Sequence, residues 1–236
     1  MGTKAVVETY GRLAAHYDRR WSFYIEATLR ETLRRLALQP RERLLDVGCG
    51  TGVLMEAIAA AIPDVELAGA DASPEMLAVA RRRLGDGALL REGQAERLPF
   101  ADGSFDVVSS TNAFHYFRDP VAALEEMARV LRPSGRLVIT DWCDDYLACR
   151  ICDLWLRLFD RAHFRTYGRE ELRQLVEQAG FRPVRIDRYK ISWLWGLMTA
   201  VGRRVAAESG ERPGPPQGRA ARWNRSAAWP TDCGAS

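Results

Sequence analysis

The segment that most constrains this 236-residue chain is Leu44-Leu-Asp-Val-Gly-Cys-Gly-Thr-Gly52. Residues 43–47 have the apolar run of a buried strand, and residues 51–61 have the apolar spacing of a helix. A glycine-rich turn between a strand and a helix lets a ligand approach the backbone closely, and free N–H groups at the helix start can bind an anionic part of it. The segment therefore predicts a ligand site at the end of the first strand of an α/β fold.

Strand and helix patterns alternate along the rest of the chain. A helix is expected over 23–38, before the glycine segment, and further helices over 74–84, 121–131 and 169–179; strands are expected over 65–70, 88–91, 105–110 and 136–141. Such alternation with short connections indicates right-handed crossovers and a parallel sheet covered on both faces. Residues 181–191 and 193–201 have strand patterns with no helix between them, which only antiparallel neighbours allow. We predict a Rossmann-like, doubly wound α/β fold.

Composition limits the domain organisation and the class of partner. We expect the folded domain over residues 41–207, an N-terminal helical segment over 1–40, and a disordered Pro/Gly/Arg-rich tail over 208–236. Arginines and acids in residues 203–236 account for the whole net charge of +3, so a polyanion-binding face on the main domain is not expected. The five scattered cysteines suit reduced thiols, and neither a signal peptide nor a membrane-spanning run is visible, which predicts a cytoplasmic protein.

The spacing of the glycines argues against a dinucleotide. The fingerprint G-x-G-x-x-G/A needs a small residue where this chain has Val53, and Gly52 comes one step early. Asp46 would repel a pyrophosphate by about 4 kcal/mol at ~4 Å and an effective dielectric of ~20. S-adenosylmethionine has no phosphate and carries a sulfonium and an ammonium. Asp71 ends the second strand, where it can accept from ribose hydroxyls; the alternative is an Asx-turn or helix-capping role shared with Ser73.

Four ordered motifs between residues 44 and 142 carry a resemblance. LLDVGCGTG, GADASPEML, GQAERLPFADGSFDVV and RVLRPSGRLVITDW together resemble the class I S-adenosylmethionine-dependent methyltransferases, and most closely the group with the ubiquinone and menaquinone biosynthesis C-methyltransferases. The resemblance implies a seven-stranded, mostly parallel sheet with an antiparallel C-terminal hairpin strand. It also implies an N-terminal lid over residues 1–40.

The resemblance, taken with the residues already discussed, predicts which side chains contact the cofactor. Gly48, Cys49 and Gly50 are expected against its amino-acid part, with Asn112 nearby, and Ala95 against the adenine edge. Relatives often have an acid at position 94, where this chain has Gln94; its amide oxygen can accept the same hydrogen bond, and Glu96 is an alternative acceptor. The complete predicted set is Tyr17, Asp46, Gly48, Cys49, Gly50, Gly52, Asp71, Ala72, Gln94, Ala95, Glu96 and Asn112.

Methyl transfer from a sulfonium is an in-line displacement, so alignment of the acceptor supplies much of the rate. His115 and Tyr116 follow the fourth strand on the expected side of the methyl group, and we predict them as catalytic, with His115 as the base for an acceptor that carries a proton. The alternative is that residues 114–117 form a packed aromatic loop that covers the cofactor. Tyr17 and Tyr24 belong to an N-terminal aromatic set that can face the sulfonium or only pack a helix onto the sheet.

Two groups of side chains could in principle bind a metal ion, but the rest of the sequence does not support a metal site. Asp141, Asp144 and Asp145 are oxygen ligands suited to Mg²⁺, but no companion motif accompanies them. Cys143, Cys149 and Cys152, with His163, are soft ligands for zinc or arsenite, but a second cysteine pair is missing. We expect no metal, with solvated acids and packing thiols instead.

The sequence thus predicts an S-adenosylmethionine-dependent methyltransferase acting on a small-molecule acceptor. The apolar, aromatic insert at 142–164 suggests that this acceptor is hydrophobic or aromatic, although a helix covering the sheet needs the same residues. One alternative is a non-catalytic protein that senses or binds S-adenosylmethionine. Another is an RNA methyltransferase, whose only support is the arginine-rich tail.

Overall fold

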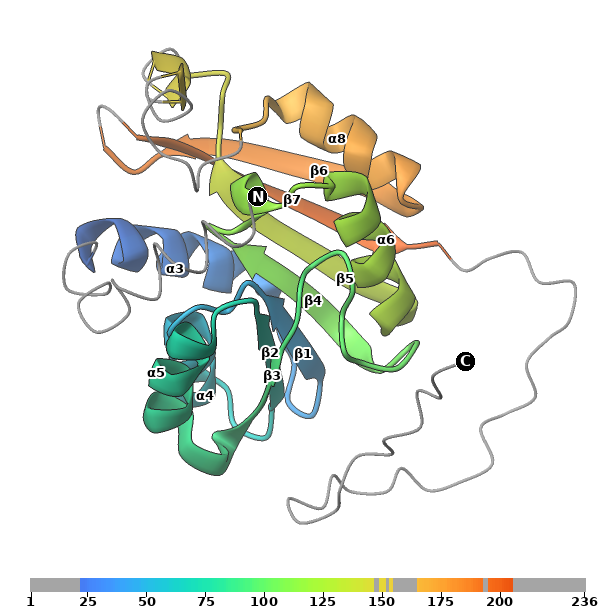
Figure 1. Ribbon diagram of the computed structural model, residues 1–236. Coiled ribbons are helices and arrows are strands. Elements are labelled where there is room, and N and C mark those ends of the chain that lie inside the picture. The colour runs from blue at the N-terminus through green and yellow to red at the C-terminus, as the bar shows by residue number, and fades with distance from the viewer. Residues whose placement is uncertain (1–21, 147–148, 152, 155–164, 193–194, 206–236) are drawn as a thin grey trace, which may run out of the picture. The chain divides into compact units, whose positions relative to one another are not determined.

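A computed structural model describes residues 22–146, 149–151, 153–154, 165–192 and 195–205. Seven strands form one sheet in the order β3-β2-β1-β4-β5-β7-β6 (Figure 1). The strands are β1 (Arg43–Val47), β2 (Glu66–Asp71), β3 (Ala88–Glu92), β4 (Phe105–Thr111), β5 (Leu131–Trp142), β6 (Phe181–Lys190) and β7 (Gly196–Arg204). All neighbours are parallel except β7, which runs antiparallel to both β5 and β6. The predicted seven-stranded sheet with its antiparallel hairpin strand is confirmed.

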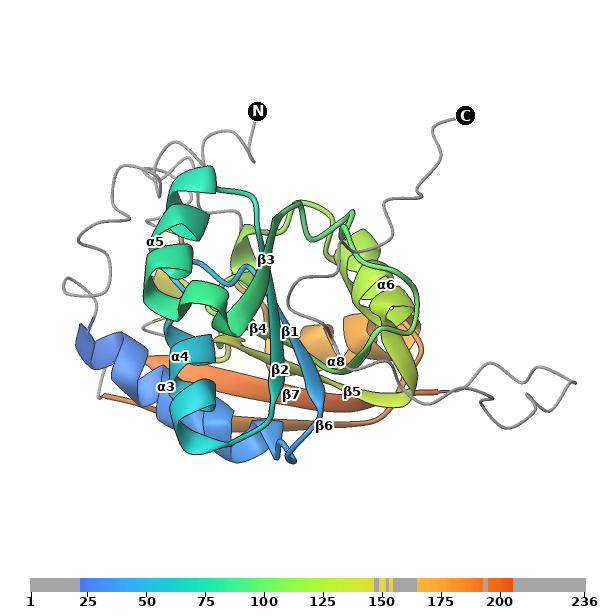
Figure 2. The same cartoon turned by 90° about the horizontal axis from the view of Figure 1, so that it is seen from below.

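Helices cover both faces of this sheet. Figure 2 shows α3 (Ser22–Leu36), α4 (Val53–Ala61) and α5 (Pro74–Leu84) on one face, and α6 (Pro120–Val130) and α8 (Arg169–Gln178) on the other. Each face has its own apolar core, in which Met55, Ile58 and Leu77 on the first face and Leu124 and Met127 on the second are buried. The sheet therefore forms the middle of three layers.

The helix starts follow local sequence rules. Ser73 caps α5, as predicted: its hydroxyl accepts from the backbone N–H of Met76 at 3.3 Å, and Pro74 occupies the first turn. Asp119 caps α6 in the same way by accepting from the N–H of Ala122 at 3.0 Å. The helix thus begins one residue before the predicted start at residue 121, and the Asp119 cap is a finding of the structure.

Two strands, β5 and β7, differ from their predicted limits by more than one residue. β5 begins at Leu131 rather than at residue 136, because Leu131 already pairs with Phe105 and the predicted turn at residues 133–135 is an irregularity within the strand. β7 covers Gly196–Arg204 rather than 193–201, since its pairing with β5 continues to Arg203. The expected strands are thus present, with shifted ends.

The proposed limits of the N-terminal lid and of the C-terminal tail remain predictions. Helix α3 lies within residues 1–40, whereas residues 1–21 and 206–236 lie outside the described part of the chain.

Candidate cofactor site

A cavity of about 180 Å³ opens at the carboxyl ends of β1, β2 and β4. The sheet order changes direction here: β1 has β2 on one side and β4 on the other, which is the position where open α/β sheets bind ligands. Eleven residues singled out from the sequence line this cavity: Asp46, Gly48, Cys49, Gly50, Asp71, Ala72, Gln94, Ala95, Glu96, Asn112 and Tyr116. Tyr17 lies outside the described residues, and Gly52 and His115 do not line the cavity.

The glycine turn lines the cavity with Gly48, Cys49 and Gly50. The N–H groups of Gly48 and Cys49 both donate to the carbonyl of Ala70, at 2.8 and 3.0 Å, which ties the turn to the end of β2. Gly48 has a φ of +74°, and a Cβ placed on it would lie 2.5 Å from the Cβ of Ala113. Only glycine satisfies both conditions, because other residues are strained at positive φ and the space is already filled.

Gly52 has a packing role and does not itself line the cavity. Its φ is +80°, and a Cβ there would lie 3.0 Å from a methyl carbon of Leu84 and 3.2 Å from the Cβ of Ala80. Both neighbours belong to α5. Gly52 thus allows the start of α4 to approach α5, and its contact with the cofactor stays a prediction.

Asp46 is a buried carboxyl group at the end of β1. It is 3% exposed, and its Oδ1 accepts a hydrogen bond from the hydroxyl of Ser109 on β4 at 2.7 Å. Burial raises the pKa of Asp46 to about 7; the Ser109 hydrogen bond opposes this effect, and the nearby charge of Asp71 adds to it. A cation in the cavity would favour the ionised form of this carboxyl group.

Asp71 makes the Asx-type contact that the sequence left open as an alternative, and it also lines the cavity, where its role toward the ribose stays a prediction. It lines the cavity at the end of β2, and its Oδ2 accepts from the N–H of Gly50 at 2.8 Å. Its Oδ1 accepts from the N–H of Ser73 at 2.9 Å, which is the Asx-type contact. Burial raises the pKa of Asp71, while these backbone hydrogen bonds favour its charged form. Since a carboxylate oxygen accepts more than one hydrogen bond, capacity remains for ribose hydroxyls.

The segment after β3 contributes another wall, formed by Gln94, Ala95 and Glu96. The carbonyl of Gln94 accepts from the N–H of Arg97 at 3.0 Å, which makes a tight turn. One oxygen of Glu96 accepts from the N–H of Arg118 at 3.0 Å, so this carboxylate also fixes the loop before α6. The side-chain amide of Gln94 has no comparable structural contact among the described residues.

Asn112 follows β4 and lines the cavity with a φ of +56°, in the left-handed region. The hydroxyl of Tyr24 on α3 donates to its Oδ1 at 2.6 Å, and the indole N–H of Trp142 donates to the Tyr24 oxygen at 2.5 Å. The sequence analysis placed Tyr24 in an aromatic set but did not pair it with Asn112, since the two residues are 88 positions apart.

His115 lies beside the cavity and does not line it. It is 3% exposed, and its ring centroid lies 3.9 Å from that of Tyr116, which does line the cavity. The carboxylate of Asp141 accepts from the His115 backbone N–H at 2.9 Å and contacts Nδ1 at 2.7 Å. Asp141 therefore fixes both the backbone and the ring of His115, a role that the sequence analysis did not consider for this acid.

Aromatic rings gather at this end of the sheet. Trp142 stacks on His115 with centroids 5.5 Å apart, and Trp195 packs against Trp142 at 4.7 Å. Tyr24 meets both tryptophans edge-on, at 6.4 and 6.2 Å. We call these five residues, His115, Tyr116, Trp142, Trp195 and Tyr24, the aromatic wall.

The residues considered for metal binding serve other contacts. In the described part of the chain, no group of three or more His, Cys, Asp or Glu side chains is arranged to hold a metal ion. Asp145 pairs with Arg188 at 2.7 Å, and the buried Cys149 thiol contacts the backbone of Gly196 at 3.4 Å. Burial raises the pKa of Cys143 to about 12, which keeps this thiol protonated at neutral pH. Cys152 and His163 lie outside the described residues.

A search of the described helices for a membrane-spanning segment finds none with sufficient length and apolar character.

Comparison with known proteins agrees with this geometry. Residues 45–139 match the family model described as "Methyltransferase domain". The chain is 39% identical to a demethylmenaquinone methyltransferase of Deinococcus radiodurans over 59% of its length, but it spans only 61% of that relative. It is 34% identical to an O-methyltransferase of Pyrenophora dematioidea, over 77% of this chain and 70% of the relative.

Among solved structures, a Haloferax volcanii protein in complex with the Trm112 methyltransferase activator superimposes with a TM-score of 0.74. It is 23% identical to this chain, and the match covers 84% of this chain and 98% of that one, which supports the fold. The matched domain, the relative aligned over most of its length and the cavity at the glycine turn lead to one assignment. The chain belongs to the class I S-adenosylmethionine-dependent methyltransferases.

Proposed function

We propose that this chain transfers the methyl group of S-adenosylmethionine to a small, apolar and aromatic acceptor. The observation that carries this proposal is the aromatic wall, which adjoins the cavity through Tyr116 and through the contact of Tyr24 with Asn112. Planar rings pack well on such a surface. The names of the two relatives, demethylmenaquinone methyltransferase and O-methyltransferase, are compatible with such an acceptor.

The cofactor would lie across the ends of β1, β2 and β4. In this arrangement Asp71 accepts from the ribose hydroxyls, Gln94 accepts from the adenine amino group, and Asp46 stabilises the positive charge of the amino-acid part. No phosphate is needed at the glycine turn, and the carboxyl groups of Asp46 and Asp71 oppose one.

The acceptor would approach the methyl carbon from the side of Tyr116. If the acceptor atom carries a proton, His115 is the proposed base. With Asp141 ionised, Nδ1 of His115 must hold the hydrogen of their 2.7 Å contact, so the basic lone pair of the neutral ring is on Nε2. Asp141 would then hold the tautomer and stabilise the cation that forms.

The direct test has two stages on the purified full chain. Calorimetry with S-adenosylmethionine and with S-adenosylhomocysteine measures cofactor binding. Release of S-adenosylhomocysteine is then measured with a panel of acceptors: hydroquinones, catechols and phenols on one side, small amines and amino acids on the other. We expect turnover with the aromatic members. Turnover restricted to the polar amines would overturn the proposed acceptor class, and binding without turnover in any acceptor mixture would favour the sensor alternative.

A further inference from the structure

Helix α3 is fixed to the sheet by a chain of buried hydroxyl groups. Thr32 on α3 donates to Thr140 on β5 at 3.0 Å, and Thr140 contacts Thr199 on β7 at 2.9 Å. The hydroxyl of Tyr189 on β6 completes the chain by contacting Thr199 at 2.8 Å. The three threonines are buried, so these bonds are protected from water.

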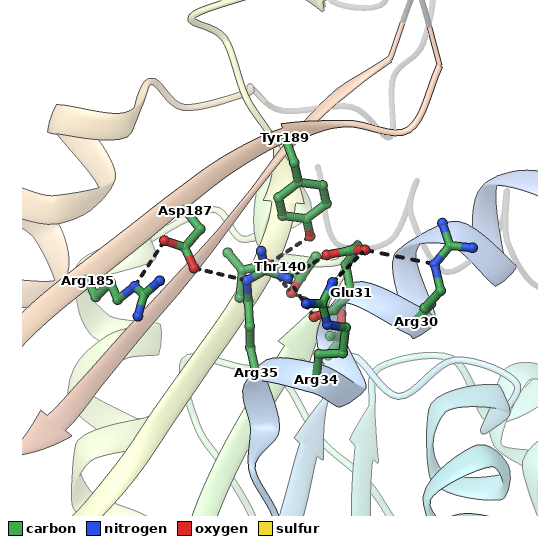
Figure 3. Close-up of polar contacts among 10 residues, drawn as sticks. Arg30, Glu31, Arg34, Arg35, Thr140, Arg185, Asp187 and Tyr189 are labelled. Carbon is green, nitrogen blue, oxygen red and sulfur yellow. Dashed lines mark hydrogen bonds and ion pairs between the residues drawn. The ribbon is translucent and has the colours of Figure 1, made fainter.

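The same helix is held at the sheet edge by charge. Arg35 pairs with Glu31 at 2.7 Å and with Asp187 on β6 at 3.2 Å, and its guanidinium lies over the ring of Tyr189, 4.6 Å from the centroid (Figure 3). Helix α3 thus has a defined position along the sheet. Its first turn carries Tyr24 and the cavity-lining Ile25, and its second turn carries Leu29, which also lines the cavity.

The hydrogen bonds around Tyr24 have a fixed direction. An indole N–H can only donate, so Trp142 donates to the Tyr24 oxygen. A tyrosine hydroxyl has a single hydrogen, and this hydrogen is donated to Oδ1 of Asn112. The two hydrogen bonds from Trp142 to Tyr24 and from Tyr24 to Asn112, which we call the relay, therefore fix the orientation of the Asn112 side-chain amide. The amide oxygen accepts from Tyr24, and the NH₂ group is the donor that faces other partners.

The cavity needs such a donor for an anionic ligand group. Among the described residues that line it, none is a Lys, Arg or His, whereas Asp46, Asp71 and Glu96 are acids. Within the described part of the chain, the Asn112 NH₂ group donates no hydrogen bond to another residue. The neighbouring Thr111, which also lines the cavity, has a buried hydroxyl with no partner among the described residues. Two neutral donors therefore follow one another at the end of β4.

We propose that Tyr24 is a positioning residue for the cofactor's carboxylate: its hydroxyl, held by Trp142, orients Asn112 so that the amide NH₂ donates to that carboxylate. This inference rests on S-adenosylmethionine as the cosubstrate in the proposed function. It gives helix α3 a role in binding the amino-acid part of the cofactor, in addition to covering the cavity.

The test compares two ligands that differ only in the amino-acid part. S-adenosylhomocysteine has the carboxylate, and 5′-methylthioadenosine lacks it. Replacement of Tyr24 by Phe keeps the ring and removes the relay, so we expect calorimetry to show about tenfold weaker binding of S-adenosylhomocysteine. Binding of 5′-methylthioadenosine should change less than about twofold. Asn112→Ala should show the same pattern, and the double variant should lose little more than Asn112→Ala alone.

Tyr189→Phe is the matched control, because it removes a hydroxyl from the other end of the α3 contacts without touching Asn112. It should leave both affinities unchanged. Equal losses for both ligands in Tyr24→Phe would mean that Tyr24 only packs the helix, and no loss for either would mean that it does not orient Asn112; both results overturn the proposal. If the wild-type protein bound neither ligand, the proposed function itself would fail.

Discussion

The two halves of the sheet are built by different means. In the half formed by β1, β2 and β3, backbone geometry shapes the cavity through a glycine at positive φ and N–H groups that donate to the carbonyl of Ala70, and acids lie at the strand ends. In the half formed by β5, β7 and β6, the surroundings of the cavity are made of side chains from distant segments, such as Thr32 with Thr140 and His115 with Asp141. The first half suits a ligand shared by a family, and the second half can vary with the acceptor.

The largest expected effect concerns the half of the sheet formed by β5, β7 and β6, where side chains from distant segments surround the cavity. His115→Asn should lower kcat by about 100- to 10,000-fold with a hydroxyl acceptor, because the proposed base is lost. It should leave the affinity for S-adenosylhomocysteine within about twofold. Asp141→Asn should show a smaller loss of kcat, because the ring of His115 is then held less firmly. Steady-state kinetics measure both variants, and an unaltered kcat in His115→Asn would show that residues 114–117 only pack.

In the half of the sheet formed by β1, β2 and β3, a substitution in the glycine turn should lower the stability of the fold as well as the affinity for the cofactor. Gly48→Ala places a methyl group 2.5 Å from the Cβ of Ala113 at a positive φ, so we expect a loss of about 2–4 kcal/mol in unfolding free energy and weaker cofactor binding. Gly85→Ala is the control, since Gly85 also has a positive φ but no atom within 4 Å of an added Cβ. Denaturant unfolding of both variants distinguishes filled space from backbone strain. Equal effects would contradict the close approach at Gly48.

Asp46 should make cofactor binding depend on pH. Its pKa is about 7 in the empty protein, and a cation favours the ionised form, so affinity for S-adenosylmethionine should rise by about tenfold from pH 6 to pH 8. Asp46→Asn should remove this dependence, as calorimetry across the range can show. A wild-type affinity that stays constant with pH would mean that Asp46 does not face the cation.

The same carboxyl group affects the stability of the empty protein. Its pKa is higher in the folded chain than the ordinary 3.8, so the folded state binds the proton more tightly. The unfolding free energy should therefore fall as pH rises from about 4 to about 7, by up to about 4 kcal/mol from this group. Denaturant titrations of wild-type and Asp46→Asn protein at both ends of that range isolate the contribution.

The smallest effect is expected where α3 meets β5. Thr32→Val keeps the shape and removes one buried hydrogen bond, which should cost about 1 kcal/mol of unfolding free energy. Because Thr140 keeps its contact with Thr199, affinity for S-adenosylhomocysteine should stay unchanged. A large loss of affinity in this variant would show that the position of α3 is set by this one bond.

The difference between the two halves of the sheet also explains which features of the site could be predicted from the sequence. The glycine turn, Asp71 and the Ser73 cap follow from short local patterns, because the backbone geometry of a strand–turn–helix unit depends on residues close in sequence. The pairings of Tyr24 with Asn112 and of His115 with Asp141 join segments 88 and 26 residues apart, and they appear only once the sheet order is known. The packing role of Gly52 could not be predicted from local pattern, because its neighbours Ala80 and Leu84 lie on another helix.

The most direct test is to titrate the purified chain by calorimetry with S-adenosylmethionine and, separately, with NAD⁺. The two acids at the glycine turn, Asp46 and Asp71, predict saturable binding of the sulfonium cofactor and no measurable heat with the dinucleotide. Saturable binding of NAD⁺ without binding of S-adenosylmethionine would contradict the account. A pyrophosphate would then bind beside Asp46 and Asp71, whose negative charges are expected to exclude it and to favour a cationic nucleoside.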